Sequence, residues 1–247
     1  MIYRPVIVIP CHNHSDAFEK FAPRVAVANL PVIVVDDGSK PVMGRKLRRI
    51  CTQYDFKYIH NWPNGGKGRA MAIGFDTALS AGYTHALQID ADGQHDVNDI
   101  EKFINMSRAA PDAIIVGNPL YGADAPRGRV VGRRITNFWV MVETWCRTMP
   151  DAMCGFRVYP LNETVRQMRR LRFFRMGFDI EILVRLYWAR VPVVGCNTRV
   201  IYPADGISNF KMIVDNFHIS LMHIYLCIMM PIKMILRWCK KCKNKLK

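Results

Sequence analysis

Acidic residues are scarce in this chain of 247 residues, which carries 20 Asp and Glu against 35 Lys and Arg and has a formal net charge of +15. A chain this basic favours polyanionic partners, namely nucleic acid, anionic lipid headgroups or phosphorylated substrates. Internal repeats and low-complexity segments are also absent, and half of the residues are hydrophobic. Length and composition therefore predict one ordered α/β domain with an appendage rather than two independent domains.

The eight cysteines lack the regular spacing of a disulfide framework, and the pair Cys239 and Cys242 has no second pair at zinc-binding spacing. Reduced thiols of a cytosolic protein are the simpler interpretation. Residues 1–10 lack the basic start, apolar stretch and cleavage site of a signal peptide, so we expect no secretion.

Strand and helix signals alternate over the first 120 residues, and arginine-rich helical segments follow. The expected strands are short aliphatic runs at residues 6–10, 32–35, 58–60, 86–89 and 113–116, with a later strand near 191–202. The expected helices are residues 16–28, 45–54, 68–81, 98–108, 130–149 and 162–170. This order predicts a mostly parallel sheet with right-handed crossovers and with ligands at the carboxyl ends of its strands.

Carboxylates follow two of these strands at the point where each strand ends. Asp36 and Asp37 close the second strand, whereas Asp90 and Asp92 close the fourth and are followed by Gln94. Repelling carboxylates in one crevice need a cation or a donor-rich ligand. An Asp-x-Asp pair followed by Gln offers the hard oxygen ligands that Mg²⁺ or Mn²⁺ prefers. Turn formation by Asp and Gly is the alternative, and two clusters in this order favour the cation site.

A glycine-rich segment, N-W-P-N-G-G-K-G at residues 61–68, precedes the third expected helix. Glycine main chain at a helix N-terminus suits an anion, and Lys67 adds a positive charge. The segment lacks the spacing and the Ser or Thr of a Walker A loop. An ordinary surface turn is the alternative interpretation.

Taken in order, these segments resemble the motifs of glycosyltransferase family 2, the inverting enzymes of GT-A fold, and in particular its dolichyl- and polyprenyl-phosphate sugar transferases. The resemblance covers most of the chain. The matching segments are residues 9–13 (IPCHN), 34–39 (VVDDGS), 64–68 (NGGKG), 90–95 (DADGQH), 151–157 (DAMCGFR), 177–181 (GFDIE) and 202–208 (YPADGIS). Cys154 stands in the fifth segment where those transferases have Ser. The resemblance implies an α/β fold of GT-A (Rossmann-like) type, with a mostly parallel sheet flanked by helices.

The resemblance also implies a donor site at the ends of the early strands. The residues implied in nucleotide-sugar binding are Pro10, His12, Asn13, Asp36, Asp37, Lys67, Asp90, Ala91 and Asp92. The implied ligands of Mg²⁺ or Mn²⁺ are Asp90, Asp92 and Gln94, and His95 is expected to be a neighbour of the metal rather than a ligand. Such an ion neutralises the charge that develops on the departing nucleotide diphosphate.

The acceptor side departs from the family pattern. Asn118 stands where phosphate-accepting members often place an Arg, but nearby guanidinium groups can replace it because they bind phosphate bidentately. The expected acceptor-binding residues are Arg127, Arg129, Arg133, Arg134 and Arg157. A solvated or headgroup-facing basic face is the alternative.

A hydroxyl acceptor needs a general base, whereas a phosphate acceptor is already ionised and needs none. Asp179, Asp151 and Glu181 are the candidates for a catalytic base, with Asp179 preferred. A carboxylate stabilised at a helix N-terminus is the alternative for Asp179 and Glu181.

The tail is apolar at residues 219–236 and basic after them. His223, Pro231 and Lys233 interrupt the apolar run, and no acid follows Asp215. A membrane-spanning helix needs about 20 apolar residues, so we expect this run to be too short to cross. An apolar segment beside a basic cluster predicts an interfacial amphipathic helix on an anionic membrane surface. A core helix or an oligomer interface is the alternative.

The sequence thus predicts a GT-A domain over residues 1–210, with a nucleotide-sugar half at 1–118 and an acceptor half at 119–210, and a membrane-associating tail at 211–247. The expected activity is metal-dependent, inverting transfer from a UDP- or GDP-sugar to a membrane-associated lipid or lipid-phosphate acceptor, at the cytoplasmic face of a membrane. The alternatives are a transferase for a non-lipid hydroxyl with the tail as an oligomer interface, a sugar nucleotidyltransferase, and a basic nucleic-acid-binding module. The chain lacks the glycine-rich N-terminal signature of a sugar nucleotidyltransferase. It also lacks a clear aromatic platform or recognition helix for nucleic acid, so no nucleic-acid partner is expected.

Overall fold

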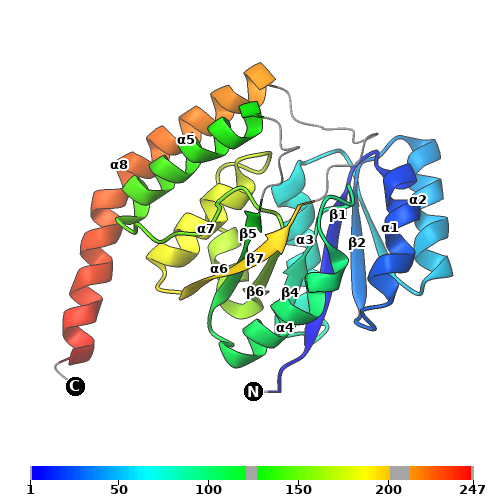
Figure 1. The fold of residues 1–247 in the computed structure, drawn as a ribbon, viewed down its shortest axis with the longest axis horizontal. Helices are drawn as coiled ribbons and strands as arrows, with labels where there is room; N and C mark the ends of the chain where they lie inside the picture. Colours follow the sequence, from blue (N-terminus) through cyan, green and yellow to red (C-terminus); the bar gives the residue numbers. More distant parts are fainter. Residues whose placement is uncertain (1, 121–126, 201–211, 246–247) are drawn as a thin grey trace.

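The computed structural model describes residues 2–120, 127–200 and 212–245, with the main chain alone at residues 127, 129 and 236–245. Strands and helices alternate along most of the chain (Figure 1). In chain order they are β1 (Pro5–Cys11), α1 (Ser15–Ala26), β2 (Val32–Asp37), α2 (Pro41–Gln53), β3 (Lys57–Asn61), α3 (Lys67–Ser80), β4 (His85–Gln88), α4 (Ile100–Ala109), β5 (Ile114–Leu120), α5 (Arg127–Thr144), β6 (Arg157–Pro160), α6 (Leu161–Met168), α7 (Phe178–Trp188), β7 (Val193–Arg199) and α8 (Met212–Lys245).

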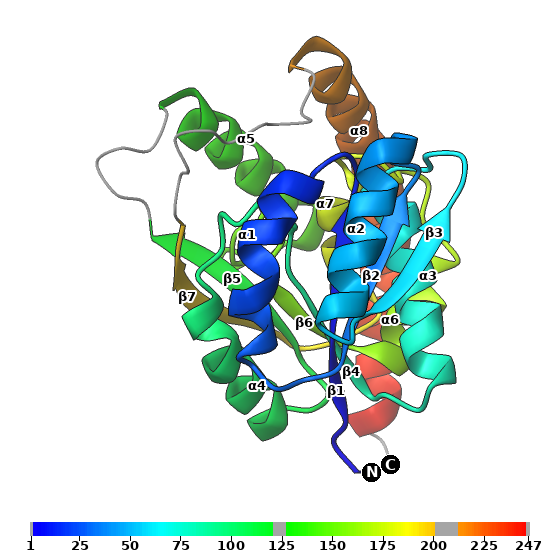
Figure 2. The ribbon, with the colours of Figure 1, turned by 90° about the vertical axis from the view of Figure 1, so that its right-hand side faces the viewer.

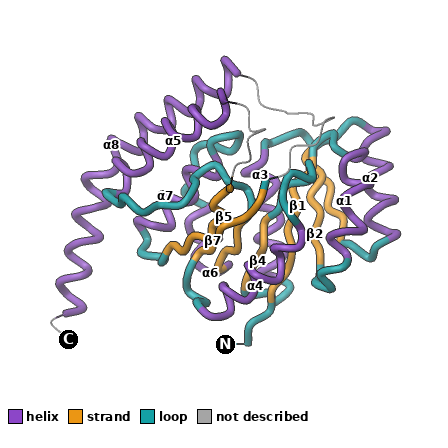
Figure 3. Tube along the Cα trace, in the orientation of Figure 1, coloured by secondary structure: helices purple, strands orange, loops and turns teal. Residues whose placement is uncertain are grey.

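The strands form one sheet in the order β3-β2-β1-β4-β6-β5-β7, with helices on both faces (Figure 3). The pairings of β1 with β2 and β4, of β2 with β3, and of β5 with β7 are parallel. The strand β6 pairs antiparallel with both β4 and β5. The prediction of a mostly parallel α/β sheet flanked by helices is confirmed.

Alternate strand residues feed two hydrophobic layers, as the two-residue period of a strand requires. Along β1, Ile7 and Ile9 face the layer that contains side chains of α1, α2 and α4. Val6 and Val8 face the other layer, built with α3, α5, α6, α7 and α8. Figure 2 shows α1 and α2 in front of the sheet. The polar residues at the end of β2 and after β4 lie beyond these layers, at the carboxyl ends of the parallel strands.

Two elements were not predicted from the sequence. The strand β6 has only four residues and holds no long aliphatic run, so periodicity gave no signal for it. The helix α7 buries nearly every residue from Phe178 to Trp188. A helix that is enclosed on all sides has no polar face, and therefore lacks the amphipathic pattern by which helices are recognised.

The helix α8 corrects the expectation that the apolar tail is too short to cross a membrane. The helix continues through Pro231, and its segment Met212–Ile235 has 24 residues and is apolar enough to cross a membrane by length and composition. One side of it nevertheless packs on the domain, where Ile219, Met222 and Leu226 are buried with residues of α5 and α7. Figure 1 shows α8 lying beside α5 along the edge of the molecule.

Candidate active site

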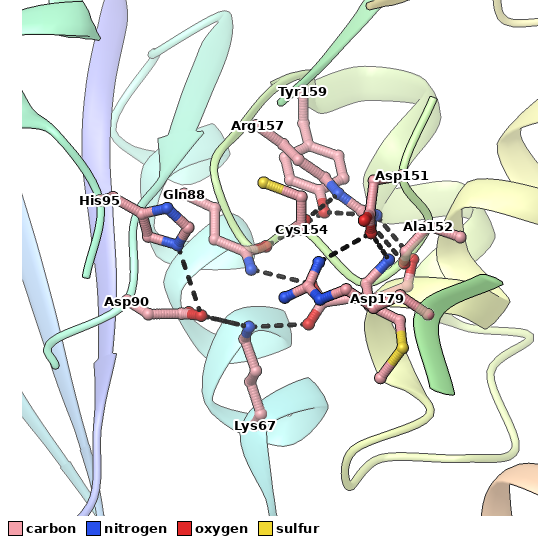
Figure 4. A network of polar contacts seen from close by, with 12 residues as sticks. Lys67, Gln88, Asp90, His95, Asp151, Ala152, Cys154, Arg157, Tyr159 and Asp179 are labelled. Atoms are coloured by element: carbon pink, nitrogen blue, oxygen red, sulfur yellow. Dashed lines mark hydrogen bonds and ion pairs between the residues drawn. The ribbon is translucent and has the colours of Figure 1, made fainter. Parts of the chain in front are cut away.

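The predicted site residues meet at one edge of the sheet, because β1 to β4 are parallel and end there. The antiparallel strand β6 begins at the same edge, with Arg157 paired opposite Gln88. The loop before β6, which carries Asp151 and Cys154, is thereby brought to the carboxylates that follow β4. Sequence segments up to 112 residues apart become one site by this arrangement (Figure 4).

Asp36 lies at the end of β2 and is completely buried. Its carboxylate accepts hydrogen bonds from the Ser39 main chain at 3.0 Å and from the Tyr58 hydroxyl at 2.7 Å, and lies 3.1 Å from Nδ1 of His60. Burial alone raises the pKa of a carboxyl group, but these partners outweigh it and hold the pKa of Asp36 below its ordinary value. All of the contacts are to the chain itself, so the predicted contact with a nucleotide stays a prediction.

Asp37 fastens the glycine-rich loop to the end of β2. Its carboxylate accepts hydrogen bonds from the main-chain N–H of Gly65 at 2.9 Å, from that of Gly66 at 2.7 Å, and from the Asn61 side chain at 2.7 Å. Gly66 has a φ of +90°, and a Cβ placed there would lie 2.6 Å from the carbonyl oxygen of Phe174. Only glycine fits this turn, which places Lys67 at the start of α3.

The loop after β1 is held against the same strand end. Nδ1 of His12 lies 2.9 Å from the carbonyl oxygen of Asp37. The main-chain N–H of Asn13 donates to the Ser39 hydroxyl at 2.9 Å, and its side-chain oxygen accepts from the Lys40 main chain at 2.8 Å. Pro10 is half-buried and Ala91 is buried. These predicted donor residues therefore gather around the ends of β1, β2 and β4.

Lys67 is the centre of the charged part of the site. Its Nζ lies 2.8 Å from Oδ1 and 2.9 Å from Oδ2 of Asp90, and 2.7 Å from Oδ2 of Asp179 (Figure 4). Burial disfavours the ammonium form, but the two carboxylates outweigh burial and raise the pKa of Lys67. Burial likewise disfavours the charged form of Asp90, but Lys67 and His95 lower the pKa of Asp90. Lys67 and Asp90 are therefore both charged at neutral pH.

Two buried neutral side chains complete this cluster, and the sequence reasoning missed both. Gln88 donates its amide to Oδ1 of Asp179 at 2.8 Å and accepts the Tyr159 hydroxyl at 3.1 Å. A polar residue inside the aliphatic run of β4 was the available signal for Gln88. No comparable signal marks Tyr159, because aromatic residues are common in buried strands.

The residues predicted to bind a metal fit a divalent ion that is shared with a diphosphate. Oδ1 of Asp90 is buried and lacks a hydrogen bond, although it faces Lys67. Asp92 uses Oδ1 to accept the main-chain N–H of Gln94 at 3.0 Å. Among the described residues no cluster of three or more His, Cys, Asp or Glu could hold a metal alone. Mg²⁺ is commonly held by one or two carboxylates plus substrate phosphates, which suits this set.

His95 is buried beside the predicted metal residues. Its Nε2 lies 3.9 Å from Oδ2 of Asp90, and its Nδ1 has no partner. The ring packs on Phe156, with the ring centroids 5.3 Å apart.

The five residues predicted to bind the acceptor lie in different surroundings. Arg157 is fully buried and donates to the carbonyl oxygens of Ala152, Cys154 and Asp179, so it can act on an acceptor only through the main chain that it supports. Arg133 donates to Asp151 at 2.9 Å, whereas Arg134 is exposed on α5. The side chains of Arg127 and Arg129 lie outside the described residues, as does the segment 202–208.

The other two candidate bases are also engaged with partners. Asp151 accepts Arg133 and the Met153 main chain at 2.8 Å. Glu181 is buried, accepts the main-chain N–H of Phe173 at 2.8 Å, and pairs with Arg185 at 2.7 Å. Burial raises the pKa of the neighbouring Cys154 thiol to about 11, so that group stays protonated at neutral pH.

Residues 6–159 match the family described as Glycosyl transferase family 2. The chain belongs to this family. The matched residues include the loops after β1 and β2, the glycine-rich loop with Lys67, and the Asp-x-Asp segment. The match ends within β6, so it includes Tyr159 but not Asp179.

Two curated members of the family carry informative names. The human dolichyl-phosphate beta-glucosyltransferase is 28% identical over 210 residues, which are 76% of this chain and 64% of that protein. The polyprenol monophosphomannose synthase of Mycolicibacterium smegmatis is 28% identical over 116 residues, 45% of this chain and 44% of that one. The chain thus spans about half to two thirds of the length of the curated relatives it matches.

Solved structures of low sequence identity share the fold. The glucosyl-3-phosphoglycerate synthase of Mycobacterium tuberculosis, solved with Mn²⁺ and UDP-glucose, superposes with a TM-score of 0.67 at 13% identity and covers 92% of this chain and 78% of that chain. S. aureus TarS, solved with UDP-GlcNAc, gives a TM-score of 0.58 at 10% identity over 90% of this chain and 66% of that one. The predicted GT-A architecture is confirmed by these likenesses.

Proposed function

We propose that this family 2 protein transfers a sugar, with inversion, from a UDP- or GDP-sugar to a lipid phosphate at a membrane surface. The observation that carries the proposal is the state of the three candidate bases. Asp179 faces Lys67 and Gln88, Asp151 faces Arg133, and Glu181 faces Arg185. A hydroxyl acceptor requires a carboxylate that can take a proton, whereas an ionised phosphate oxygen attacks without one.

In the proposed reaction a phosphate oxygen of the acceptor forms a bond to the anomeric carbon, and the bond from that carbon to the nucleotide diphosphate breaks. No proton has to move. Asp90 and Asp92 would hold a divalent ion, which would neutralise charge on the departing diphosphate. Asp37 and the glycine-rich loop hold the donor side rigid, and Arg134 is a cation for the acceptor phosphate. The names of the curated relatives, which include dolichyl-phosphate and polyprenol transferases, support this acceptor class.

An apolar surface on α5 and α8 supports the membrane part of the proposal. It consists of exposed large side chains on one flank of the domain: Val131, Ile135, Phe138, Trp139, Phe217, Leu221, Ile224, Ile228, Ile232 and Ile235. On α8 these residues recur every three or four positions and therefore share one face of the helix, and an exposed apolar face of this kind is typical of a membrane or protein contact. The net charge of +15 favours an anionic membrane.

The packing of α8 supports attachment to the membrane surface rather than crossing. Residues from Asp215 to Leu226 of this helix are buried at intervals against the domain. Farther along the helix, Met229, Met230 and Met234 pack on the same hydrophobic layer, so contact with the domain continues through this apolar segment. We therefore propose that α8 lies in the interface, with the site open to cytosolic nucleotide-sugars.

The test is a nucleotide-release assay with UDP- and GDP-sugars and Mn²⁺, using a polyprenyl phosphate and the polyprenol of the same chain length as paired acceptors. We expect nucleotide release with the phosphate and none above background with the alcohol. The proposal predicts that NMR of the product shows the anomeric configuration opposite to that of the donor. Transfer to the alcohol in preference to the phosphate would overturn the acceptor assignment.

A further inference from the structure

The two carboxylates that share the Lys67 ammonium are not equivalent. Asp179 is the more buried of the two, with 8% of its side chain exposed against 26% for Asp90. Both of its oxygens are engaged, Oδ1 by Gln88 and Oδ2 by Lys67, and its main-chain carbonyl accepts Arg157. Asp179 is therefore a fixed anchor for the ammonium group.

Asp90 is the weaker and more open partner. Its Oδ1 lies 2.8 Å from the ammonium nitrogen but receives no hydrogen bond, since the contact is close without the required direction. A carboxylate oxygen that is buried and incompletely satisfied is an unfavourable arrangement by itself. A stronger cation at the same oxygen removes this deficit.

The Lys67 ammonium cannot move toward the loop that contains Gly155. A Cβ at Gly155 would lie 2.3 Å from Oδ2 of Asp90 and 2.8 Å from Nζ of Lys67, so the main chain of residue 155 closes that side. Lys67 is the first residue of α3, and its flexible four-carbon stem allows the ammonium to turn about its contact with Asp179.

Asp90 and Asp92 would hold a divalent ion, which would place two further positive charges close to the Lys67 ammonium. Like charges at such separations in a partly buried site repel strongly. The diphosphate of a nucleotide-sugar would bind with that ion, and its oxygens would attract an ammonium at a helix N-terminus. Repulsion by the metal ion and attraction by the diphosphate would both favour movement of the Lys67 ammonium from Asp90 to the diphosphate.

We infer that Lys67 is a displaceable internal counter-ion, which neutralises Asp90 while the donor site is empty and releases this carboxylate when a metal-bound nucleotide-sugar enters. The inference rests on the proposed function, because it assumes that the donor arrives with a divalent ion. It adds that metal and nucleotide bind cooperatively: the metal alone must compete with Lys67, whereas the nucleotide diphosphate receives the displaced ammonium.

The experiment measures Mn²⁺ binding by electron paramagnetic resonance, with and without UDP, for the full chain and for Lys67→Met. In the absence of UDP, the variant should bind Mn²⁺ about tenfold more tightly, a size typical of coupling between neighbouring ligands. In the presence of UDP the order should reverse, because the variant has no ammonium to offer the diphosphate. Lys57→Met, at an exposed lysine at the far end of β3, is the matched control and should leave both affinities unchanged.

Thermal unfolding of each variant establishes that it is folded, and Lys67→Gln provides a second neutral side chain if Lys67→Met unfolds. Equal or weaker Mn²⁺ binding by both neutral variants without UDP would overturn the inference and leave Lys67 a permanent structural bridge. Mn²⁺ binding is measured without any acceptor, so its outcome is independent of the transfer assay. A result that contradicts the proposed acceptor class can therefore be told apart from a result that contradicts the inference about Lys67.

Discussion

Carboxylates on the two sides of this site are held by different chemistry. Asp36 and Asp37, at the end of β2, accept hydrogen bonds from main-chain amides, from Tyr58 and from Asn61, and Asp36 lies 3.1 Å from the His60 ring. The carboxylates near β4, β6 and α7 face cations instead: Asp90 and Asp179 share Lys67, Asp151 faces Arg133, and Glu181 faces Arg185. Main-chain amides and neutral side chains hold a loop in one geometry. An ammonium or guanidinium group can instead leave its carboxylate and pair with a charged ligand. We therefore expect the end of β2 to act as a scaffold, and the charged cluster around Lys67 to be the part of the site that can exchange a partner.

The largest effect is expected where the two sides meet, at Asp92. Asp92→Ala should reduce transfer by about 10³-fold or more, because a metal ion contributes several kcal/mol to the stabilisation of the departing diphosphate. The steady-state rate with saturating Mn²⁺ measures the loss. Asp76→Ala removes an exposed carboxylate of α3 and should retain full activity. Full transfer by the Asp92 variant in the presence of EDTA would refute the metal assignment.

A second prediction concerns the apolar surface rather than the site. Replacing the exposed Ile224 and Ile228 by Ser should weaken binding to anionic vesicles about 10-fold to 100-fold, since two large apolar side chains no longer enter the membrane. Vesicle co-sedimentation at low and high salt measures it, and high salt should weaken but not abolish binding by the unaltered chain. Val27→Ser with Val42→Ser, two exposed apolar residues of the α1 and α2 region, is the matched control.

This pair of substitutions is a cleaner test than removal of residues 217–247. Deleting that segment would uncover the buried contact of Ile219, Met222 and Leu226 with the domain, and would destabilise the fold together with the membrane contact. Unchanged vesicle binding by the Ile224 and Ile228 variant would favour an oligomer interface instead.

A smaller effect is expected from the acceptor-side arginines. Arg134→Ala should raise the acceptor KM about fivefold and leave donor affinity unchanged, because an exposed cation near an anionic headgroup contributes ~1 kcal/mol. Arg133→Ala is less informative, since it also removes the partner of Asp151. Arg166→Ala, at an exposed guanidinium of α6, serves as the control. Collapse of nucleotide-sugar affinity in the Arg134 variant would contradict the separation of donor and acceptor sides.

The smallest effect tests the scaffold itself. The pKa of Asp36 lies below its ordinary value of 3.8 in the folded chain, so this carboxylate contributes stability above that pH and loses it as the pH falls further. Asp36→Asn should therefore lower Tm by about 3–6 °C at pH 7, and the difference should shrink below pH 4. Thermal scans between pH 3 and 7 measure this. A difference that grows at low pH would show that the hydrogen bonds to Asp36 do not favour its charged form.

The sequence predicts those helices and strands whose pattern of apolar and polar residues matches their burial in the fold. Buried parallel strands read as aliphatic runs, and the acids that end β2 and β4 were recognised because they interrupt such runs. The partners of those acids were not predictable: Lys67 and Asp179 are 112 residues apart, and only the insertion of β6 and the packing of α7 bring them together. The two-sided burial of α7 and the four-residue length of β6 removed the periodic signal in just the segments that assemble the charged cluster.

The place of β6 in the sheet also has a consequence for the order in which the chain can fold during synthesis. It fills the position between β4 and β5, although it is made after both of them. Until residues 157–160 have emerged from the ribosome, the inner edges of β4 and β5 have no described strand to pair with, and β7, which follows, has only β5 as its neighbour. A nascent chain that ends near residue 118 thus exposes open strand edges, which are templates for misassociation. We expect the predicted donor half to depend on the later chain for its stability, and to behave as one cooperative unit with it rather than as a separable module.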